Sequence, residues 1–236
     1  MTEKEKLEQL SVFFPAYNEE ENAPIVVEKT LKVLPGVADE YEVIIVNDGS
    51  QDHTGEVAEE LSRAHPSVRA IHHEINRGYG GALRTGFRAA RYPWVAFIDS
   101  DGQFDFADIE RFLPFTQSAD LILGYRLQRA DSAVRRLYTF GWALIPRLLL
   151  GLDVKDYSCG FKLIKKSVIE AVEPLQGEEK VYQIELLVKA KRKGFRFAEV
   201  GVHHYPREFG KQTGASLKVV FRSIREMFDL YRRLRS

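Results

Sequence analysis

Two aspartates, Asp99 and Asp101, follow an apolar segment at residues 94–98. Divalent cations such as Mg2+ and Mn2+ prefer carboxylate oxygens, and they take further ligands from water or substrate phosphates. An Asp-x-Asp turn at the end of a strand therefore suits a metal that binds a diphosphate. The same side chains would also fit a turn that caps a following helix, so the pair alone leaves both interpretations open.

Two further polar loops carry residues suited to binding a phosphate or a base. Asp48 ends another apolar segment, and the Gly-Ser pair after it permits a tight turn. Residues 76–81 read Asn-Arg-Gly-Tyr-Gly-Gly, and these glycines allow a ligand to approach the backbone closely. The loop lacks both the Gly-x-Gly-x-x-Gly spacing and the Gly-Lys-Ser/Thr ending, so neither a dinucleotide fold nor a P-loop is indicated.

The hydrophobic pattern supplies the elements that would position these loops. Short apolar runs predict strands at residues 10–14, 42–46, 68–72, 94–98 and 120–123. A periodicity of 3.6 residues predicts helices at residues 24–34, 54–64, 80–91 and 106–115. Such alternation is typical of an α/β fold with a mostly parallel sheet, whose ligand crevice lies at the carboxyl ends of the strands. The second half is less regular, and we interpret it as an elaboration of the same single domain.

Composition narrows the class of protein. The 236 residues are 44% hydrophobic and 29% charged, which suits one large domain with a sizeable core. The 34 basic and 34 acidic side chains cancel, so no nucleic acid is expected as a partner. Cys159 is the single cysteine, and residues 1–10 lack an apolar export segment. A cytoplasmic location is therefore expected.

The order of the polar motifs resembles family 2 glycosyltransferases of the GT-A fold, and among them the polyprenyl-phosphate (dolichol-phosphate) mannosyltransferase-like group. The resemblance covers roughly residues 10–220, and its motifs lie at residues 14–20, 46–54, 76–82 and 97–103. It implies a mostly parallel, Rossmann-like sheet flanked by helices. We expect an N-terminal tail at 1–9, the GT-A domain at 10–215 and an amphipathic basic helix at 216–236.

The same resemblance implies the residues of the site. A Mg2+ or Mn2+ ion would be held by Asp99, Asp101 and Gln103. The nucleotide sugar would be contacted by Pro15, Tyr17, Glu19, Val46, Asp48, Asn76, Gly78, Ser100 and Lys211. The acceptor would be contacted by Arg126, Arg135, Thr139 and Arg207, and the residues expected to be catalytic are Asp99, Asp101, Arg126 and Arg135.

Two later motifs depart from the family pattern. Residues 156–162 are similar to an Asp-x-x-Ser-Gly-Phe-Arg segment but carry Cys159 and Lys162 in place of Ser and Arg. Residues 211–216 are similar to an Arg-x-x-Gly-x-Ser segment but begin with Lys211. Lysine keeps the charge and loses the bidentate fork of arginine, so we expect altered acceptor contacts, with Arg207 able to take over a phosphate contact.

Arginines gather after the strand predicted at 120–123, at positions 126, 129, 135 and 136. Arginine suits phosphate, although a solvated charged face would look the same. The apolar run at 137–150 is too short to span a bilayer, and Tyr138 and Trp142 favour an interfacial position over a buried core helix. Apolar residues at 217, 220, 221, 224, 227, 228 and 231 form a stripe that would pack on the domain, while the basic face would favour anionic lipid.

These observations predict a metal-dependent, inverting transfer of a sugar, with GDP-mannose as the favoured donor, to a polyprenyl phosphate. The protein would be peripheral, on the cytoplasmic face of the membrane. An acceptor phosphate is already ionised at neutral pH and needs no general base. The alternatives are a donor such as UDP-glucose with a hydroxyl acceptor, for which Asp156 or Glu185 would be the base, and a non-catalytic adaptor that binds a membrane or partner.

Overall fold

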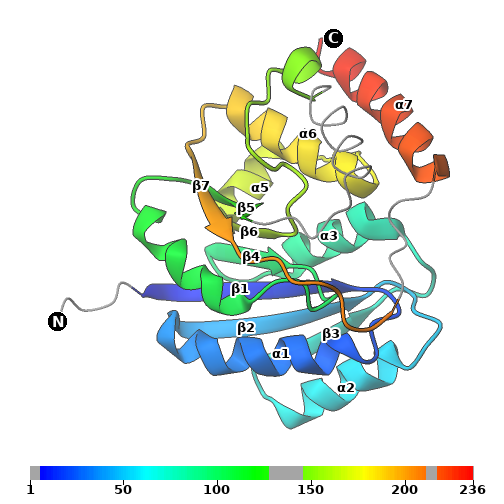
Figure 1. Cartoon of the computed structure of the whole chain (residues 1–236). Coiled ribbons are helices and arrows are strands. Elements are labelled where there is room, and N and C mark those ends of the chain that lie inside the picture. Colours follow the sequence, from blue (N-terminus) through cyan, green and yellow to red (C-terminus); the bar gives the residue numbers. More distant parts are fainter. Residues whose placement is uncertain (1–5, 128–145, 211–216, 236) are drawn as a thin grey trace.

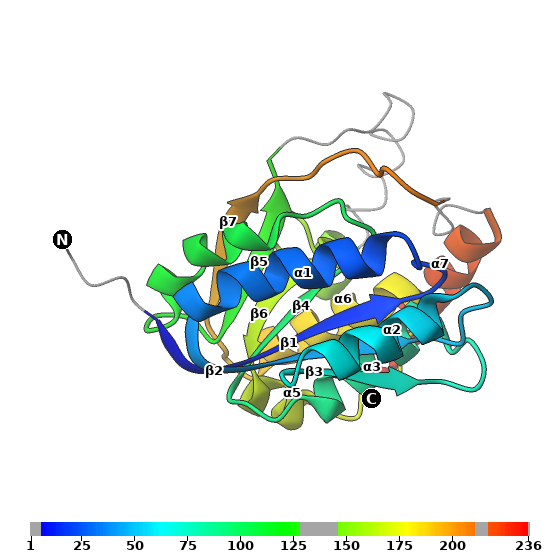
Figure 2. The same cartoon turned by 90° about the horizontal axis from the view of Figure 1, so that it is seen from below.

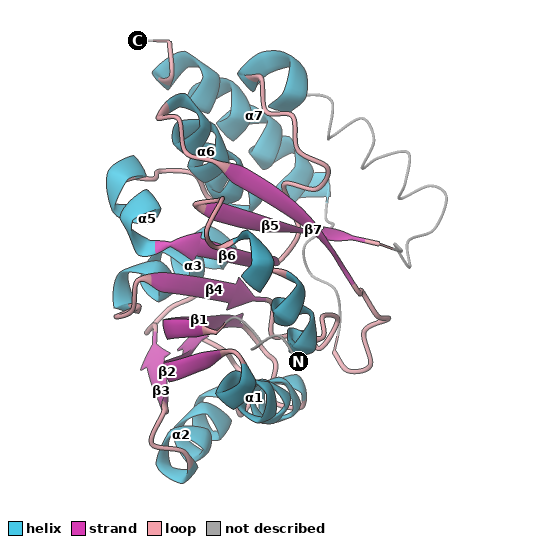
Figure 3. Cartoon of the chain, turned by 90° about the vertical axis from the view of Figure 1, so that its left-hand side faces the viewer, coloured by secondary structure: helices cyan, strands magenta, loops and turns pink. Residues whose placement is uncertain are grey.

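A mixed sheet of seven strands forms the centre of the chain in this computed structural model, which describes residues 6–127, 146–210 and 217–235. The strand order is β3-β2-β1-β4-β6-β5-β7, as Figure 3 shows. The strands are β1 (Leu7–Ala16), β2 (Ala38–Asn47), β3 (Val68–His72), β4 (Trp94–Ile98), β5 (Leu121–Arg126), β6 (Phe161–Lys165) and β7 (Phe197–Val202). β6 runs antiparallel to both of its neighbours, and the other adjacent pairs are parallel.

Helices cover both faces of the sheet and make three layers (Figure 1). The helices are α1 (Asn22–Val33), α2 (Thr54–Ala64), α3 (Gly78–Ala89), α5 (Lys166–Val172), α6 (Glu179–Arg192) and α7 (Leu217–Arg233). Three 3-10 helices are η1 (Leu34–Gly36), η2 (Phe106–Arg111) and η3 (Leu113–Phe115). The helices α1, α2 and η2 pack on one face, and α3, α5, α6 and α7 pack on the other. Figure 2 shows the face that α1 and α2 cover.

Side chains of the central strands alternate between the two cores, as the two-residue period of a strand requires. Val12 and Phe14 of β1 enter the core under α1 and α2, whereas Phe13 enters the core under α3 and α6. The ring of Phe13 meets Phe87 edge to face, with 4.9 Å between their centroids. Gly86 lies so close to Phe13 that a Cβ at position 86 would be 2.2 Å from its ring. The absence of a side chain there lets α3 approach the sheet.

The predicted α/β domain is confirmed, and all five predicted strands are present. β1 begins at Leu7, so part of the expected tail at 1–9 belongs to the sheet. The helix expected at 106–115 is wrong in type, because this segment forms η2 and η3, with Pro114 at the start of η3 and Asp105 capping η2. The apolar-run criterion missed β6, since a charged residue, Lys162, occupies a buried position in it.

The connections bring all the polar loops to one edge of the sheet. β1, β2 and β4 are parallel, so their carboxyl ends lie together at this edge. The antiparallel strand β6 begins there, with Phe161 opposite Ile98, and β5 and β7 both end there. The loops 99–103, 156–160 and 203–210 therefore meet, although they lie far apart in the sequence.

Helix α7 lies at the C-terminal end, and of the apolar stripe expected there the structure describes the side chains of Met227, Phe228 and Tyr231. Met227 and Leu230 are fully buried against the domain, whereas Phe228 is 49% exposed. Within the described ranges, no helix is long and apolar enough to cross a membrane. Lipid binding by the basic face of this helix stays a prediction.

Candidate active site at the carboxyl edge of the sheet

Asp99 lies where β4 ends, on the side of the sheet that α3 covers. Its Oδ1 accepts a hydrogen bond of 2.7 Å from the hydroxyl of Tyr79. Its backbone N–H donates to the carbonyl of Gly160, and a Cβ at position 160 would lie 1.8 Å from Oδ2 of Asp99. The carboxylate is therefore fixed between a phenol and a residue that must be glycine.

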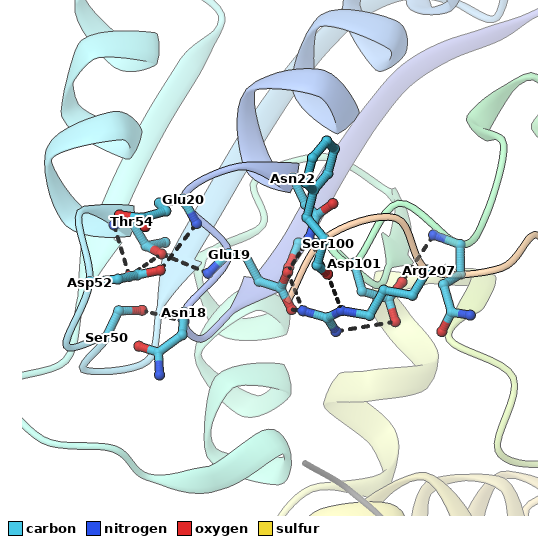
Figure 4. Close-up of polar contacts among 12 residues, drawn as sticks. Asn18, Glu19, Glu20, Asn22, Ser50, Asp52, Thr54, Ser100, Asp101 and Arg207 are labelled. Carbon is cyan, nitrogen blue, oxygen red and sulfur yellow. Dashed lines mark hydrogen bonds and ion pairs between the residues drawn. The ribbon is translucent and has the colours of Figure 1, made fainter. Parts of the chain in front are cut away.

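A cluster of charges surrounds Asp101 (Figure 4). Nη2 of Arg207 lies 2.8 Å from both carboxylate oxygens of Glu19, and its Nη1 lies 4.0 Å from Oδ2 of Asp101. The amide of Asn22 also donates to Glu19, at 2.7 Å. Arg207 thus joins the end of β1 to the Asp-x-Asp turn, from a loop that follows β7.

The carboxylates of the site have raised pKa values. Burial and the charge of Asp101 raise the pKa of Asp99 to about 7. Burial also raises the pKa of Asp101, against the lowering effect of the Gln103 N–H and of Arg207. Burial raises the pKa of Glu19, although Asn22 and Arg207 oppose it. Asp99 and Asp101 lie close together and each disfavours its ionised form. A bound cation would favour the ionised form of both carboxylates.

The donor set fits a hard cation. Gln103 donates its Nε2 to the carbonyl of Tyr205 at 3.0 Å, which leaves Oε1 for another partner. Asp99, Asp101 and Gln103 would offer only oxygen ligands, the preference of Mg2+ and Mn2+. In the part of the chain that the structure describes, no cluster of three or more His, Cys, Asp or Glu side chains could hold a metal. Such an ion would need phosphate oxygens or water to complete its shell.

Asp48 is buried at the end of β2 and is held by its neighbours. Its Oδ1 lies 2.6 Å from Nδ1 of His73 and accepts the N–H of Arg77 at 2.9 Å. Nε2 of His73 lies 2.8 Å from the hydroxyl of Thr85. At Gly49, where φ is +67°, a Cβ would lie 2.6 Å from the backbone N of Asn76. The loop after β2 and the loop at residues 76–81 are therefore in contact.

The remaining residues expected to contact the nucleotide lie along the same edge. The carbonyl of Pro15 accepts a hydrogen bond from Ser100 at 2.7 Å, and Tyr17 is half-buried. Asn76 is exposed, and its side chain accepts the N–H of Gly78 at 2.9 Å. The side chain of Val46 is fully buried in the core, and its backbone lies within the sheet between β1 and β3.

Side chains that were not among the predicted site residues hold the loop after β1 in place (Figure 4). The hydroxyl of Thr54 accepts the N–H of Glu19 at 2.8 Å. Asp52 and Ser50 accept the N–H groups of Glu20 and Asn18, at 3.3 and 3.0 Å. The start of α2 therefore fixes the loop that follows β1.

Arg126, at the end of β5, reaches the loop before β6. Its Nε and Nη2 donate to the two oxygens of Asp156 at 2.8 and 3.0 Å, and Nη2 also donates to Ser158 at 2.9 Å. Arg135, Thr139 and Lys211 lie outside the described residues, as does Trp142. The structure thus brings together Arg126, Asp99, Asp101, Gln103, Glu19 and Arg207 at one edge.

Two charged residues of the second half are buried. Lys162, which stands in place of the arginine of the family motif at 156–162, is fully buried. Glu185 is buried on α6, where its carboxylate accepts the N–H groups of Gln176 and Gly177. These bonds occupy Glu185 as a structural group, and they remove it as a candidate base.

Sequence reasoning missed several residues that support the site, including Tyr79, His73 and Gly160. Tyr79 lies inside the motif at 76–82, and Gly160 lies inside the motif at 156–162, so the motifs could have indicated both. His73 carries no such signal. It follows β3 and meets Asp48 only because β2 and β3 pair in parallel.

Comparisons with known proteins agree with this geometry. A family model described as "Glycosyl transferase family 2" matches residues 11–173. An undecaprenyl-phosphate mannosyltransferase from Micrococcus luteus is 30% identical over 207 residues, which are 84% of each chain. A dolichyl-phosphate beta-glucosyltransferase from Homo sapiens is 31% identical over 216 residues, covering 83% of this chain and 67% of that protein.

A solved structure shares the fold. Glucosyl-3-phosphoglycerate synthase from Mycobacterium tuberculosis, in complex with Mn2+, UDP and phosphoglyceric acid, superposes with a TM-score of 0.70. The identity is 19%, over 95% of this chain and 78% of that chain. At this level of identity the likeness concerns the arrangement of the sheet and helices.

Proposed function

The chain belongs to glycosyltransferase family 2 and is a glycosyltransferase, and from that premise we propose that it transfers a sugar from a nucleotide sugar to a polyprenyl phosphate. The observation that carries the proposal is that Asp99 and Asp101 lie at the same edge of the sheet as Arg126, close enough for the charge of its guanidinium to lower the pKa of both carboxyls. Oxygen donors suit a metal-bound diphosphate, and a partly buried arginine suits a phosphate acceptor. This choice of acceptor is supported by relatives that are named as undecaprenyl-phosphate and dolichyl-phosphate glycosyltransferases.

A divalent cation, Mg2+ or Mn2+, would be held by Asp99, Asp101 and Gln103. When bound, such a cation supplies positive charge beside the diphosphate that leaves with the nucleoside. Arg207 lies 4.0 Å from Asp101, so its guanidinium is close enough to bind an oxygen of the same diphosphate. Arg207, expected from the sequence to contact the acceptor, would therefore also contact the donor.

The donor would lie over the ends of β1 and β2. Among the described residues His73 and Arg77 both contact Oδ1 of Asp48, so Oδ2 would be available to a donor group of the base. Pro15, Tyr17 and Glu19 lie at the end of β1 or just after it and would contact the same donor. GDP-mannose is our favoured donor and UDP-glucose the alternative, because the relatives include a mannosyltransferase and a glucosyltransferase.

Arg126 would bind the acceptor phosphate. Its contacts with Asp156 and Ser158 use Nε and Nη2, so among the described residues Nη1 keeps its donors for an anion. An oxygen of the phosphate would attack the anomeric carbon as the bond to the leaving diphosphate oxygen breaks, which inverts the configuration. The acceptor oxygen is already ionised near neutral pH, and no side chain has to remove a proton.

The membrane would supply the acceptor. We propose that the chain works as a peripheral protein on the cytoplasmic face, where the arginines at 126, 129, 135 and 136 would meet lipid phosphates. The apolar run at 137–150 would lie in the interface. Leu148, in the described part of that run, is 74% exposed, as an interfacial position requires.

A transfer assay tests the proposal. The purified chain is incubated with Mn2+, labelled GDP-mannose or UDP-glucose, and undecaprenyl phosphate, with undecaprenol as the matched acceptor that lacks the phosphate. We expect label in the lipid extract only with the phosphate. Equal labelling of the alcohol would favour the hydroxyl-acceptor alternative, and no labelling with any donor would contradict the proposal.

A further inference from the structure

A line of hydrogen-bonded side chains runs through the interior from β6 to Asp99. The ammonium of Lys162 contacts Oε1 of Gln183 on α6. Nε2 of Gln183 lies 3.2 Å from the hydroxyl of Tyr79 at the start of α3. That hydroxyl lies 2.7 Å from Oδ1 of Asp99. Residues from β6, α6, α3 and the end of β4 are thus joined in one line.

The direction of every bond in this line is fixed by its first member. An ammonium can only donate, so the group of Gln183 that faces Lys162 is its carbonyl oxygen. The amide N–H of Gln183 must then donate to the oxygen of Tyr79. The single hydroxyl proton of Tyr79 remains for Asp99, which accepts it.

The line begins in the protein interior and ends at the carboxyl end of β4. Lys162 and Gln183 are 0% and 1% exposed, and the ammonium also contacts the carbonyl of Cys159 and lies 5.3 Å from the centre of the Phe97 ring. Asp99 follows Phe97 by two residues, so both side chains leave the strand toward the face that α3 and α6 cover. This is why a phenol from α3 reaches the carboxylate.

We propose that Lys162, Gln183 and Tyr79 form a positioning relay that holds the Asp99 carboxylate in the orientation in which it binds the metal–diphosphate unit of the donor. The proposal rests on the proposed function of Asp99. Oδ1 is held by the phenol and Oδ2 lies against the Cα of Gly160, so the carboxylate has one orientation before any ligand arrives. Partners that orient a metal ligand in this way contribute to affinity without touching the metal.

If Lys162, Gln183 and Tyr79 had a purely structural role, apolar side chains would stabilise the fold at a lower cost in solvation free energy. Burying an ammonium costs solvation that an apolar side chain over the Phe97 ring would not lose. The hydroxyl of Tyr182, next to Gln183 on α6, shows the contrast: it is buried with no hydrogen-bond partner among the described residues. Tyr79 and Tyr182 therefore form a matched pair, one inside the relay and one outside it.

The first variants remove one hydroxyl each. Mn2+ binding is followed through the loss of the free-ion EPR signal, without nucleotide and with UDP or GDP at a fixed concentration. We expect Tyr79→Phe to weaken Mn2+ binding by about 10- to 100-fold, the usual effect of removing a group that orients a metal ligand. We expect Tyr182→Phe to bind Mn2+ as the wild type does and to keep its Tm, whereas Tyr79→Phe, which leaves the buried Gln183 N–H without its acceptor, should show a modest fall in Tm while remaining folded in the binding assay.

The second variant tests the direction of the bonds. Gln183→Glu keeps the shape and still accepts from Lys162, but it offers no N–H to Tyr79 and lets the phenol donate to residue 183 instead of Asp99. We expect a loss of Mn2+ affinity of about tenfold with no fall in Tm. The double variant with Tyr79→Phe should bind no worse than Tyr79→Phe alone, because both act through the same hydroxyl.

The outcomes separate the two proposals. If the wild type binds Mn2+ and transfers sugar while Tyr79→Phe and Gln183→Glu bind Mn2+ equally well, the relay is overturned and the function stands. Additive losses in the double variant would also overturn it. If the wild type binds no Mn2+ with or without UDP or GDP, the metal-dependent function fails, and the relay fails with it.

Discussion

Replacing Asp99 by asparagine should stabilise the metal-free protein while removing its response to metal. The pKa of Asp99 is raised to about 7 by burial and by the charge of Asp101, against 3.8 for an ordinary aspartate. A raised pKa means that the ionised form costs folding stability, so the stability present at low pH is lost as the pH rises through about 7. The asparagine side chain would keep the hydrogen bond from Tyr79 and remove the charge.

The expected magnitude follows from the pKa. A rise of about three pH units corresponds to about 4 kcal/mol in the free energy of unfolding. Asp101 relaxes when its neighbour loses charge, and we expect about half of this, about 2 kcal/mol at pH 8. For a chain of this size the Tm would rise by about 4–8 °C. At pH 5 the folded Asp99 is protonated but the unfolded one is ionised, so a smaller difference, about 1 kcal/mol, should remain.

Differential scanning calorimetry of EDTA-treated protein at pH 5 and pH 8 measures this difference. Asp120→Asn is the control of opposite sign, since Arg196 and Lys165 hold the pKa of Asp120 well below its usual range and its removal should lower the Tm at pH 8. Mn2+ added with UDP or GDP should raise the Tm of the wild type but not that of Asp99→Asn. A lower Tm for Asp99→Asn at pH 8, or the same difference at both pH values, would refute the reasoning.

Three other substitutions have defined outcomes. Gly160→Ala should lower Mn2+ affinity by about tenfold in a calorimetric titration, because the added Cβ would lie 1.8 Å from Oδ2 of Asp99 and force the carboxylate to move. Unchanged affinity would contradict the close packing of Gly160 against Asp99. Gly86→Ala should lower the free energy of unfolding by about 2 kcal/mol, since overpacking against the Phe13 ring costs about 3 kcal/mol and the gain in helix propensity is about 1 kcal/mol. Urea denaturation measures it, and a more stable variant would show that α3 has room. Arg126→Lys should raise the KM for polyprenyl phosphate by about tenfold and leave the donor KM unchanged, because the lysine loses the fork; equal changes in steady-state kinetics would mean that Arg126 does not bind the acceptor.

The sequence predicted those parts of the site that depend on local pattern. Asp48 and Asp99 were found because each ends an apolar run, and the parallel sheet then brings the two ends together. Strand β6 was missed because the ammonium of Lys162 occupies a position that pattern reasoning assigns to the surface. Only the antiparallel pairing of β6 with β4 shows that this charge points into the interior.

Tertiary contacts decided what the sequence could not predict. The bonds from Gln183 to Tyr79 and from Arg207 to Glu19 join residues 104 and 188 positions apart. No periodicity or spacing links such positions. The helix expected at 106–115 failed for a local reason, because Pro114 lacks the N–H that would continue a helix.

Mass spectrometry of the lipid product tests the central claim most directly. The wild type, incubated with Mn2+, a nucleotide sugar and polyprenyl phosphate, should produce a lipid heavier by one sugar residue and release the nucleoside diphosphate in equal amount. The same product should be missing with EDTA and with Asp101→Asn, whose fold should remain intact by circular dichroism. Product formed at the wild-type rate in EDTA, or by Asp101→Asn, would contradict metal-dependent sugar transfer at this edge of the sheet.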